Sequence, residues 1–266
     1  MNIGIVGCGG RMGRMLIQTV LGTEGAQLSG GTEQPGSPLI GQDLGLLVGP
    51  DAAGAAVTDD AKALFEASDV VIDFTVPAAT VAHAALAFDA GTAMVIGTTG
   101  LTPEQQTAVQ GAAEKAAVVQ AGNMSLGVNL LVGLAKQAAE LLGPDYDIEV
   151  VEMHHKHKID APSGTALMLG RAAAEGRGID HDDHAVMSRE GHTGARPDDA
   201  IGYATLRGGD VVGDHTVVFA GPSERIELTH RAASREIFAR GAVRAAMWCD
   251  GQSPGLYSMR DVLNLT

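Results

Sequence analysis

The feature that most constrains the fold of this chain is a glycine-rich turn directly after its first apolar segment. Residues 3–6 read IGIV, and residues 7–13 read GCGGRMG, with glycine at positions 7, 10 and 13. A helical pattern of apolar positions continues over 12–21. Glycines in this arrangement allow a tight strand-to-helix turn and close packing of the helix on the strand. The segment therefore predicts a βα unit whose helix N-terminus is open to an anion.

Short apolar segments and Ala-rich helical segments alternate through the first 120 or so residues. Further strands are expected at 27–32, 70–74, 93–96 and 117–120, and further helices at 80–90 and 103–116. Strands that alternate with helices are typical of a parallel sheet with helices on both faces. We predict an α/β chain that begins with a Rossmann-type, doubly wound parallel sheet.

The pattern changes near residue 123. Strands without long intervening helices are expected at 146–153, 201–207, 211–220 and 225–231, and helices at 128–142, 165–175 and 237–247. These strands predict a second, α+β domain built on a mixed or antiparallel sheet. We expect residues 1–125 plus 236–266 to form the first domain and 126–235 the second. The segment 176–199 is long for a connection, which suggests a functional or interface loop.

The amino-acid composition limits the cellular compartment and the binding partners that we expect for this chain. The chain has 266 residues, 45% of them hydrophobic, and a formal net charge of −14, which argues against binding to nucleic acid or to an anionic membrane. Its two cysteines, Cys8 and Cys249, are typical of a reduced compartment. The sequence shows no signal peptide and no apolar run of about 18 residues, so we expect a cytoplasmic protein.

An acidic residue farther along the chain indicates that the glycine-rich turn binds a dinucleotide. Glu33 lies 20 residues after Gly13, at the end of the second expected strand, where a carboxylate can hold the hydroxyls of an adenosine ribose. This charge repels a 2′-phosphate, and Gln34 offers no guanidinium to hold one, although Arg11 partly offsets the repulsion. The site therefore favours NADH, with NADPH possible. The alternative is an ordinary βα turn with extra glycines and a solvated glutamate.

Two more loops follow expected strands at the same edge of the sheet. They are DFTVP at 73–77 and GTTG at 97–100. Ligands of open α/β sheets bind at this edge, so both loops are candidates for cofactor contacts. For 97–100 the alternative is a plain strand-to-helix connection with Thr102 as the helix cap.

Residues 152–166, EMHHKHKIDAPSGTA, hold an unbroken basic run from His154 to Lys158 in an otherwise acidic chain. If the strand continues, His154, Lys156 and Lys158 face one side; if it turns early, the set can converge. Residues 163–165, at the start of the helix expected over 165–175, add backbone N–H and hydroxyl donors, so the segment predicts an anion pocket with proton donors. The alternatives are a metal site, for which no His-Glu-x-x-His helix exists, and an exposed basic strand end.

The segment 152–166 closely resembles the signature of the 4-hydroxy-tetrahydrodipicolinate reductase, or dihydrodipicolinate reductase, family of bacterial lysine and diaminopimelate synthesis. Further segments that carry the resemblance are 6–13, 73–77, 97–100, 123–129, 207–215 and 227–231. The resemblance implies reduction of 4-hydroxy-tetrahydrodipicolinate to tetrahydrodipicolinate. A hydride from NAD(P)H would pass to a small cyclic imine that carries two carboxylates.

The resemblance also implies roles for individual residues. The catalytic residues, which transfer protons, are His154 and Lys158. The substrate-binding residues are His155, Gly164, Thr165 and Thr99. The cofactor-binding residues are Gly7, Cys8, Gly9, Gly10, Arg11, Met12, Gly13, Glu33, Phe74, Gly97, Thr98, Thr99, Ala121, Gly122, Asn123 and Met124. No metal is implied.

The family likewise implies a dinucleotide-binding first domain, and a second domain for substrate binding and oligomerisation. A homotetramer would form through the second domain's sheet, and the domains would close about hinges near 123–129 and 233–238. Two positions depart from the family pattern: Gln34 stands where a dual-specificity member has Arg, and Gly122 where Pro or Ala is common. The alternative functions are another two-domain dehydrogenase, acting on an aldehyde or sugar, and a nucleotide-binding sensor or scaffold without catalysis.

Overall fold

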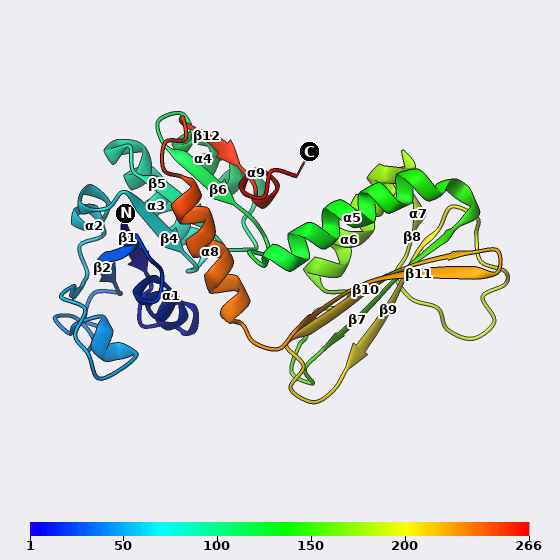
Figure 1. Cartoon of the computed structure of the whole chain (residues 1–266), viewed down its shortest axis with the longest axis horizontal. Coiled ribbons are helices and arrows are strands. Elements are labelled where there is room, and N and C mark those ends of the chain that lie inside the picture. The colour runs from blue at the N-terminus through cyan, green and yellow to red at the C-terminus, as the bar shows by residue number, and fades with distance from the viewer. Residues whose placement is uncertain (266) are drawn as a thin grey trace. The chain divides into compact units, whose positions relative to one another are not determined.

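The computed structural model describes residues 1–265, which divide into two compact units. Unit 1 comprises Met1–Leu126 and Glu236–Asn264, and unit 2 comprises Gly127–Arg235 together with Leu265. The chain thus leaves unit 1 once and returns to it, as the colour sequence of Figure 1 shows.

Unit 1 is a parallel sheet with helices on both faces (Figure 1). Its strands are β1 (Asn2–Val6), β2 (Gln27–Thr32), β3 (Val57–Thr58), β4 (Val70–Asp73), β5 (Ala93–Ile96), β6 (Ala117–Gln120) and β12 (Gly255–Tyr257). Its helices are α1 (Arg11–Leu21), η1 (Gly45–Leu47), α2 (Ala61–Ala67), α3 (Pro77–Ala90), α4 (Pro103–Ala112), α8 (Glu236–Trp248) and α9 (Met259–Val262). The strand order is β12-β6-β5-β4-β1-β2-β3, so the direction of winding reverses between β1 and β4.

Both faces of this sheet are buried, which explains why its strands read as continuous apolar runs. Val70 and Ile72 of β4 join the core beneath α1 and α8, whereas Val71 joins the core beneath α2, α3 and α4. In open sheets of this kind the ligand site lies at the carboxyl ends of the strands, where the winding reverses. The loops after β1 and β4 flank that point.

Unit 2 is a mixed sheet with two long helices on one face. Its strands are β7 (Asp147–His154), β8 (Ala185–Val186), β9 (Ile201–Arg207), β10 (Gly213–Gly221) and β11 (Glu224–Ala232). Its helices are α5 (Leu126–Leu142), η2 (Gly143–Asp145), α6 (Gly164–Arg177) and α7 (His181–His184). The order is β11-β10-β7-β9-β8, with β10 antiparallel to both neighbours and the pairs β7–β9 and β8–β9 parallel. The core holds Ala135 of α5, Leu169 of α6, Val150 of β7 and Phe219 of β10.

The predicted fold class is confirmed, and the differences lie in short elements and in element ends. The helix expected at 80–90 begins at Pro77, because proline is well tolerated at the first helical position. The helix expected at 103–116 ends at Ala112, and the strand expected from 211 begins at Gly213. The short strand β12, which was not expected from the sequence, pairs in parallel with β6.

The segment 176–199, expected as a long loop, contains the end of α6, all of α7 and the short strand β8. Two arginines of its remaining part, Arg189 and Arg196, both bond to the carboxylate of Glu149 on β7, at 2.8 and 3.0 Å. Ion pairs and a short strand therefore tie this segment to the sheet of unit 2.

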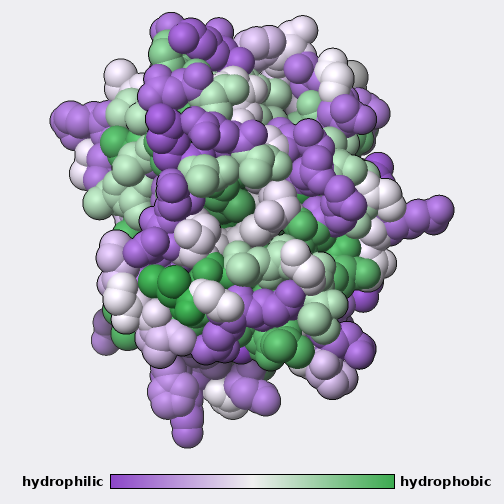
Figure 2. All heavy atoms as spheres, turned by 90° about the vertical axis from the view of Figure 1, so that its left-hand side faces the viewer, coloured by the Kyte–Doolittle hydropathy of each residue, from purple (hydrophilic) through white to green (hydrophobic). Residues whose placement is uncertain are grey.

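Several large apolar residues of unit 1 are exposed at its surface. Figure 2 shows a face on which small hydrophobic groups are interspersed with hydrophilic side chains. Leu21, Leu46 and Val76 are 51%, 55% and 59% exposed. Isolated exposed apolar residues are normal for a folded protein. Within residues 1–265 no helix combines the length and the apolar character that crossing a bilayer requires.

Candidate active site

The glycine-rich turn joins β1 to α1 at the carboxyl edge of the unit 1 sheet. Gly7 has a φ of +67°, a conformation that glycine adopts without strain. A β-carbon at position 13 would lie 2.4 Å from the Gly7 carbonyl oxygen, so only glycine lets α1 pack this closely on the turn. The N-cap residue, Gly10, supplies no side-chain cap, so the first N–H groups of α1 stay available to an anion.

Glu33 holds this turn from the end of β2. Its Oε1 accepts a hydrogen bond from the Gly9 N–H at 2.7 Å, and the Cys8 N–H bonds to the Thr32 carbonyl at 3.1 Å. The Cys8 side chain is fully buried, and burial raises the pKa of its thiol to about 11. Cys8 therefore has only its backbone to offer a ligand, whereas Glu33 keeps a second carboxylate oxygen.

The loops after β4 and β5 are tied together by Asp73, which is fully buried. Its Oδ1 accepts bonds from the Thr75 N–H at 2.8 Å, the Thr75 hydroxyl at 2.6 Å and the Thr98 hydroxyl at 3.1 Å. Its Oδ2 pairs with His83 Nδ1 of α3 at 2.8 Å. Burial raises the pKa of Asp73, but the hydrogen bond and charge of His83 and the Thr75 bonds outweigh it and hold that pKa below its usual value.

The other predicted cofactor residues of unit 1 lie at the same edge. The Phe74 ring packs on Gly97, where a β-carbon would come within 2.2 Å of it. Thr98 is buried with its hydroxyl on Asp73, whereas Thr99 is exposed. After β6, the Ala121 N–H bonds to the Ile96 carbonyl at 3.1 Å, and a β-carbon at Gly241 of α8 would lie 1.7 Å from the Met124 carbonyl oxygen. At Gly122 a β-carbon would meet no atom within 4 Å.

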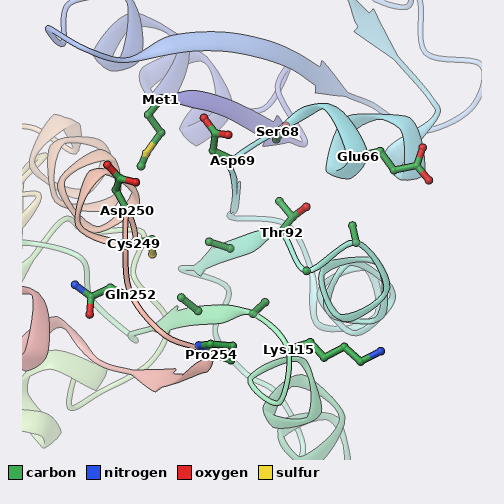
Figure 3. A pocket seen from close by; sticks show the side chains of 16 residues that line it. Met1, Glu66, Ser68, Asp69, Thr92, Lys115, Cys249, Asp250, Gln252 and Pro254 are labelled. Carbon is green, nitrogen blue, oxygen red and sulfur yellow. The ribbon is translucent and has the colours of Figure 1, made fainter.

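A separate cavity lies at the opposite, amino edge of this sheet (Figure 3). It has a volume of about 700 Å³ and is lined by Met1, the ends of α2 and α3, and the segments that lead into β4, β5, β6 and β12. Three carboxylates, Glu66, Asp69 and Asp250, border it together with Lys115. The glycine-rich turn and the 73–77 and 97–100 loops do not contribute to it, so it is not the predicted nucleotide site.

In unit 2 the basic run leaves the sheet after its first residue. β7 ends at His154, and a turn follows in which the Lys158 N–H bonds to the His155 carbonyl at 3.1 Å. The His155 N–H bonds to the Val211 carbonyl at 2.7 Å and the Lys156 N–H to the Gly209 carbonyl at 3.2 Å. Of the two arrangements considered from the sequence, the early turn is the one that forms.

His154 is buried beside a carboxylate. Its Nδ1 lies 2.5 Å from Oε2 of Glu152, which is 1% exposed. Arg207 of β9 grips the same carboxylate through both terminal nitrogens, at 2.8 and 2.9 Å. Burial raises the pKa of Glu152, but the bonds to Arg207 and His154 outweigh it, so the pKa of Glu152 lies below its usual value.

The remaining predicted substrate residues surround the start of α6. Ser163 caps this helix: its hydroxyl accepts from the Ala166 N–H at 3.1 Å and lies 2.9 Å from His215 Nε2. Gly164 and Thr165 form the first turn. Lys158 Nζ bonds to both carboxylate oxygens of Asp160 at 2.8 Å, and Lys156 and His157 are exposed. Unit 2 thus brings His154, Lys158 and the start of α6 into one neighbourhood.

The sequence interpretation expected Ser163 at the start of a helix beside the basic run, but it missed Glu152, Arg207 and His215 as parts of this cluster. The alternation of β7 held a signal for the first of them. Residues 148, 150, 152 and 154 share the buried face of the strand, which places a glutamate beside His154 inside the unit. Nothing local could pair it with Arg207, which lies 55 residues away. Among the described residues 1–265, no group of His, Cys, Asp and Glu is placed to hold a metal ion.

Unit 1 has the strand order and turn of the dinucleotide-binding class. Residues 1–124 match the family model described as "Dihydrodipicolinate reductase, N-terminus", and residues 127–263 match "Dihydrodipicolinate reductase, C-terminus". The chain belongs to the dihydrodipicolinate reductase family. This membership confirms the predicted family and, with it, the predicted class of enzyme, an NAD(P)H-dependent reductase.

Individual relatives agree with this membership. A 4-hydroxy-tetrahydrodipicolinate reductase of Afipia carboxidovorans is 57% identical over 265 residues, which are 100% of this chain and 97% of the relative. One of Brucella abortus is 54% identical over 266 residues, 100% of this chain and 99% of the relative. The solved structure of a dipicolinate-bound dihydrodipicolinate reductase from Paenisporosarcina sp. TG-14 is 25% identical, with a TM-score of 0.77 over 97% of each chain.

Proposed function

We propose that this chain reduces 4-hydroxy-tetrahydrodipicolinate to tetrahydrodipicolinate in lysine and diaminopimelate biosynthesis, in the cytoplasm. One observation carries the proposal: Glu152 connects the start of the basic turn to the start of α6, because it pairs with His154 and accepts a hydrogen bond from the Ser163 N–H. Cationic side chains and helix N–H groups are what a compact dicarboxylate requires. The related reductase with dipicolinate bound supports a substrate of this kind.

We assign proton transfer to His154 and Lys158, because histidine and lysine are donors that a protein environment tunes toward neutral pH. His155, Gly164 and Thr165 hold the substrate carboxylates, and Thr99 serves both substrate and cofactor. The α6 amides are well suited to this task, because Gly164 leaves room for a close approach: a β-carbon there would meet no atom within 4 Å.

Unit 1 is the proposed dinucleotide-binding domain, and unit 2 the domain for substrate binding and oligomerisation. The carboxyl-edge residues 7–13, 33, 74, 97–99 and 121–124 would hold the cofactor, which supplies the hydride when bound. The uncapped start of α1 fits a pyrophosphate, and Glu33 fits a ribose with free hydroxyls. The residues present therefore fit a nicotinamide dinucleotide.

We further propose that NADH is preferred over NADPH. The Glu33 carboxylate is fixed beside the turn by its bond to Gly9, and it would repel a 2′-phosphate. Gln34 is exposed and uncharged, so it supplies no compensating cation. Titration of the protein with both dinucleotides tests the preference, and tighter binding of NADPH would refute it.

A homotetramer built on the sheet of unit 2 is also proposed. Val151, Met153, Leu206 and Val218 lie on the sheet face opposite α5 and α6, and each is at least partly exposed, Leu206 by 51%. An apolar sheet face gains stability when a second sheet covers it. Light scattering coupled to size exclusion gives the assembly mass, and a monomer at micromolar concentration would contradict this proposal.

A coupled assay tests the proposed reaction. Aspartate semialdehyde, pyruvate and the synthase that forms the substrate are supplied with NADH, and NADH absorbance is followed. We expect oxidation that depends on the synthase and on this chain. If NADH oxidation stays at the level of the reaction without synthase, the chain does not act on this substrate. Oxidation supported by an unrelated aldehyde or sugar would favour the other dehydrogenase class.

A further inference from the structure

Glu152 is the only carboxylate that touches the imidazole of His154 in the described part of the chain. Both side chains project from the buried face of β7, two positions apart, and both lie inside the unit, at 1% and 8% exposed. Glu152 Oε2 approaches Nδ1 of His154 at 2.5 Å, and no hydrogen bond to Nε2 forms within residues 1–265. The two ring nitrogens therefore have different tasks.

The groups around Glu152 all donate hydrogen bonds to it, so its carboxylate acts only as a hydrogen-bond acceptor. Oε1 accepts from the Ser163 N–H at 3.1 Å and from the Thr205 hydroxyl at 3.3 Å, and the Arg207 fork donates to both oxygens. A carboxylate enclosed by donors has no proton to give, so the hydrogen in the Glu152–His154 contact belongs to Nδ1. Neutral His154 then carries its lone pair on Nε2.

We propose that Glu152 is a positioning residue for the reaction, which fixes the ring and the tautomer of His154 so that Nε2 alone exchanges a proton with the substrate. Arg207 in turn fixes Glu152 as a carboxylate. This inference rests on the proposed function, in which His154 transfers a proton. The step is a proton transfer only: in the doubly protonated imidazolium the Nε2–H bond breaks as the substrate gains the proton, which leaves neutral His154 with its proton on Nδ1, and Nε2 then takes up a proton from the solvent.

The charges around His154 come from four elements, and they oppose one another. Glu152 lies on the same strand, Arg207 on β9, Lys158 on the following turn, and the His215 ring of β10 packs edge-on at 5.0 Å between ring centroids. Burial lowers the pKa of His154, Glu152 raises it, and Lys158 and Arg207 lower it. Loss of the Glu152 charge should therefore move the pKa of His154 farther down.

Replacement of Glu152 by Gln tests the proposal, because the two side chains have the same shape. Gln has one acceptor oxygen for the donors of Arg207, Ser163 and His154, so its amide N–H₂ competes for Nδ1 and favours the opposite tautomer. We expect kcat to fall by about 10- to 100-fold, by analogy with the loss of a carboxylate that orients a metal-binding histidine. KM and the dissociation constant of NADH should change little, and the histidine limb of the pH–rate profile should move to lower pH.

Glu149→Gln is the matched control. Glu149 lies on the same strand and is also paired with arginines, Arg189 and Arg196, but its side chain projects from the other face of the sheet. We expect wild-type kcat and an unchanged pH–rate profile for this variant, with light scattering to verify its assembly. A kcat loss equal to that of Glu152→Gln would show a general requirement for ion pairs on β7 and would overturn the proposal.

Nitrogen-15 NMR of ring-labelled wild-type protein tests the tautomer without any variant or substrate. At a pH at which His154 is neutral, we expect its Nδ1 to be protonated and its Nε2 to show the shift of an unprotonated nitrogen. An Nε2–H tautomer would overturn the proposal even if Glu152→Gln does not fold. Because this measurement needs no turnover, absence of reductase activity would instead refute the proposed function, and the two failures are distinguishable.

Discussion

Within residues 1–265, a buried carboxylate–histidine pair lies at the end of a strand in each unit, and the two pairs are built differently. In unit 1, Asp73 of β4 pairs with His83 of α3 at 2.8 Å, and its other partners are Thr75 and Thr98. In unit 2, Glu152 pairs with His154 of the same strand at 2.5 Å, and its main other partner is Arg207. Asp73 connects the loops that follow β4 and β5, whereas Glu152 fixes the imidazole ring of His154.

The difference lies in what each carboxylate leaves free. Asp73 is enclosed by short side chains and backbone from the loops after β4 and β5, so it fixes the edge at which we place the dinucleotide. One carboxylate oxygen of Glu152 pairs with Nδ1 of His154, which leaves Nε2 of the same ring available to another partner. The same pair of residue types thus supports binding in one unit and, by our proposal, proton transfer in the other. The following predictions test that division.

The largest expected effect comes from Lys158→Ala. Loss of a proton donor costs about 10²- to 10⁴-fold in kcat, whereas NADH binding, which we assign to unit 1, should be unchanged. Steady-state kinetics and a fluorescence titration with NADH measure the two quantities. Lys156→Ala is the control, since Lys156 is exposed in the same turn. If Lys158→Ala loses NADH binding, the assignment of separate tasks to the two units is wrong.

The second prediction concerns stability and pH in the cluster of unit 2. Burial, and next the charge of His154, lower the pKa of His215 from 6.5 to about 4. As pH falls through that window, the unfolded chain binds a proton that the folded chain does not, so stability is lost. For His215 alone the loss is about 3 kcal/mol.

Chemical denaturation at pH 7, 5.5 and 4.5 measures this loss, with His215→Gln for comparison. Gln keeps a donor near the Ser163 hydroxyl but does not titrate, so the free energy of unfolding of the variant should fall less steeply over the window. Equal slopes for the two proteins would show that His215 is not the group responsible.

Asp73→Asn should have the opposite effect to the unit 2 variant Lys158→Ala: it should weaken NADH binding and leave kcat at saturating cofactor largely unchanged. The amide cannot accept every bond from Thr75, Thr98 and His83, and an unsatisfied buried group costs about 1–3 kcal/mol. We expect lower stability and at least about tenfold weaker NADH binding, with kcat recovered at saturating cofactor. Asp69→Asn, at the amino end of the same strand, is the control. Wild-type NADH affinity in Asp73→Asn would remove the role we give to this pair.

The smallest effect is expected at Glu33, at the same edge as Asp73. Glu33→Gln keeps an acceptor for the Gly9 N–H but removes the charge, so NADPH should bind up to about tenfold better relative to NADH. Titration with both cofactors measures the ratio, and Glu66→Gln, at the opposite edge of the sheet, should leave it unchanged. An unchanged ratio in Glu33→Gln would mean that charge at this position does not set the preference.

The sequence was most informative where one local pattern defines one element. The glycine-rich turn, the apolar strands of unit 1 and the start of α6 were all predictable, because period and turn chemistry are local. Short elements such as β12 were not, because three residues carry too little pattern and the pairing with β6 decides the structure.

The sequence named candidate site residues, whose roles stay predictions, but it did not reveal the network of contacts around them. His83 and Arg207 reach their carboxylates from other elements, across 10 and 55 residues of sequence. Such pairs depend on how strands and helices pack, which periodicity does not reveal. Glu152 is the exception among the missed residues, since the alternation of β7 held the information that it shares the buried face with His154.

Turnover at saturating NADH and saturating substrate, measured for Glu152→Gln and Asp73→Asn side by side, tests the division between the two pairs most directly. We predict that kcat of Glu152→Gln stays about 10- to 100-fold below wild type, whereas kcat of Asp73→Asn returns to within about twofold of it, a difference of under 0.5 kcal/mol. A full recovery by Glu152→Gln together with a lasting loss in Asp73→Asn would contradict the division.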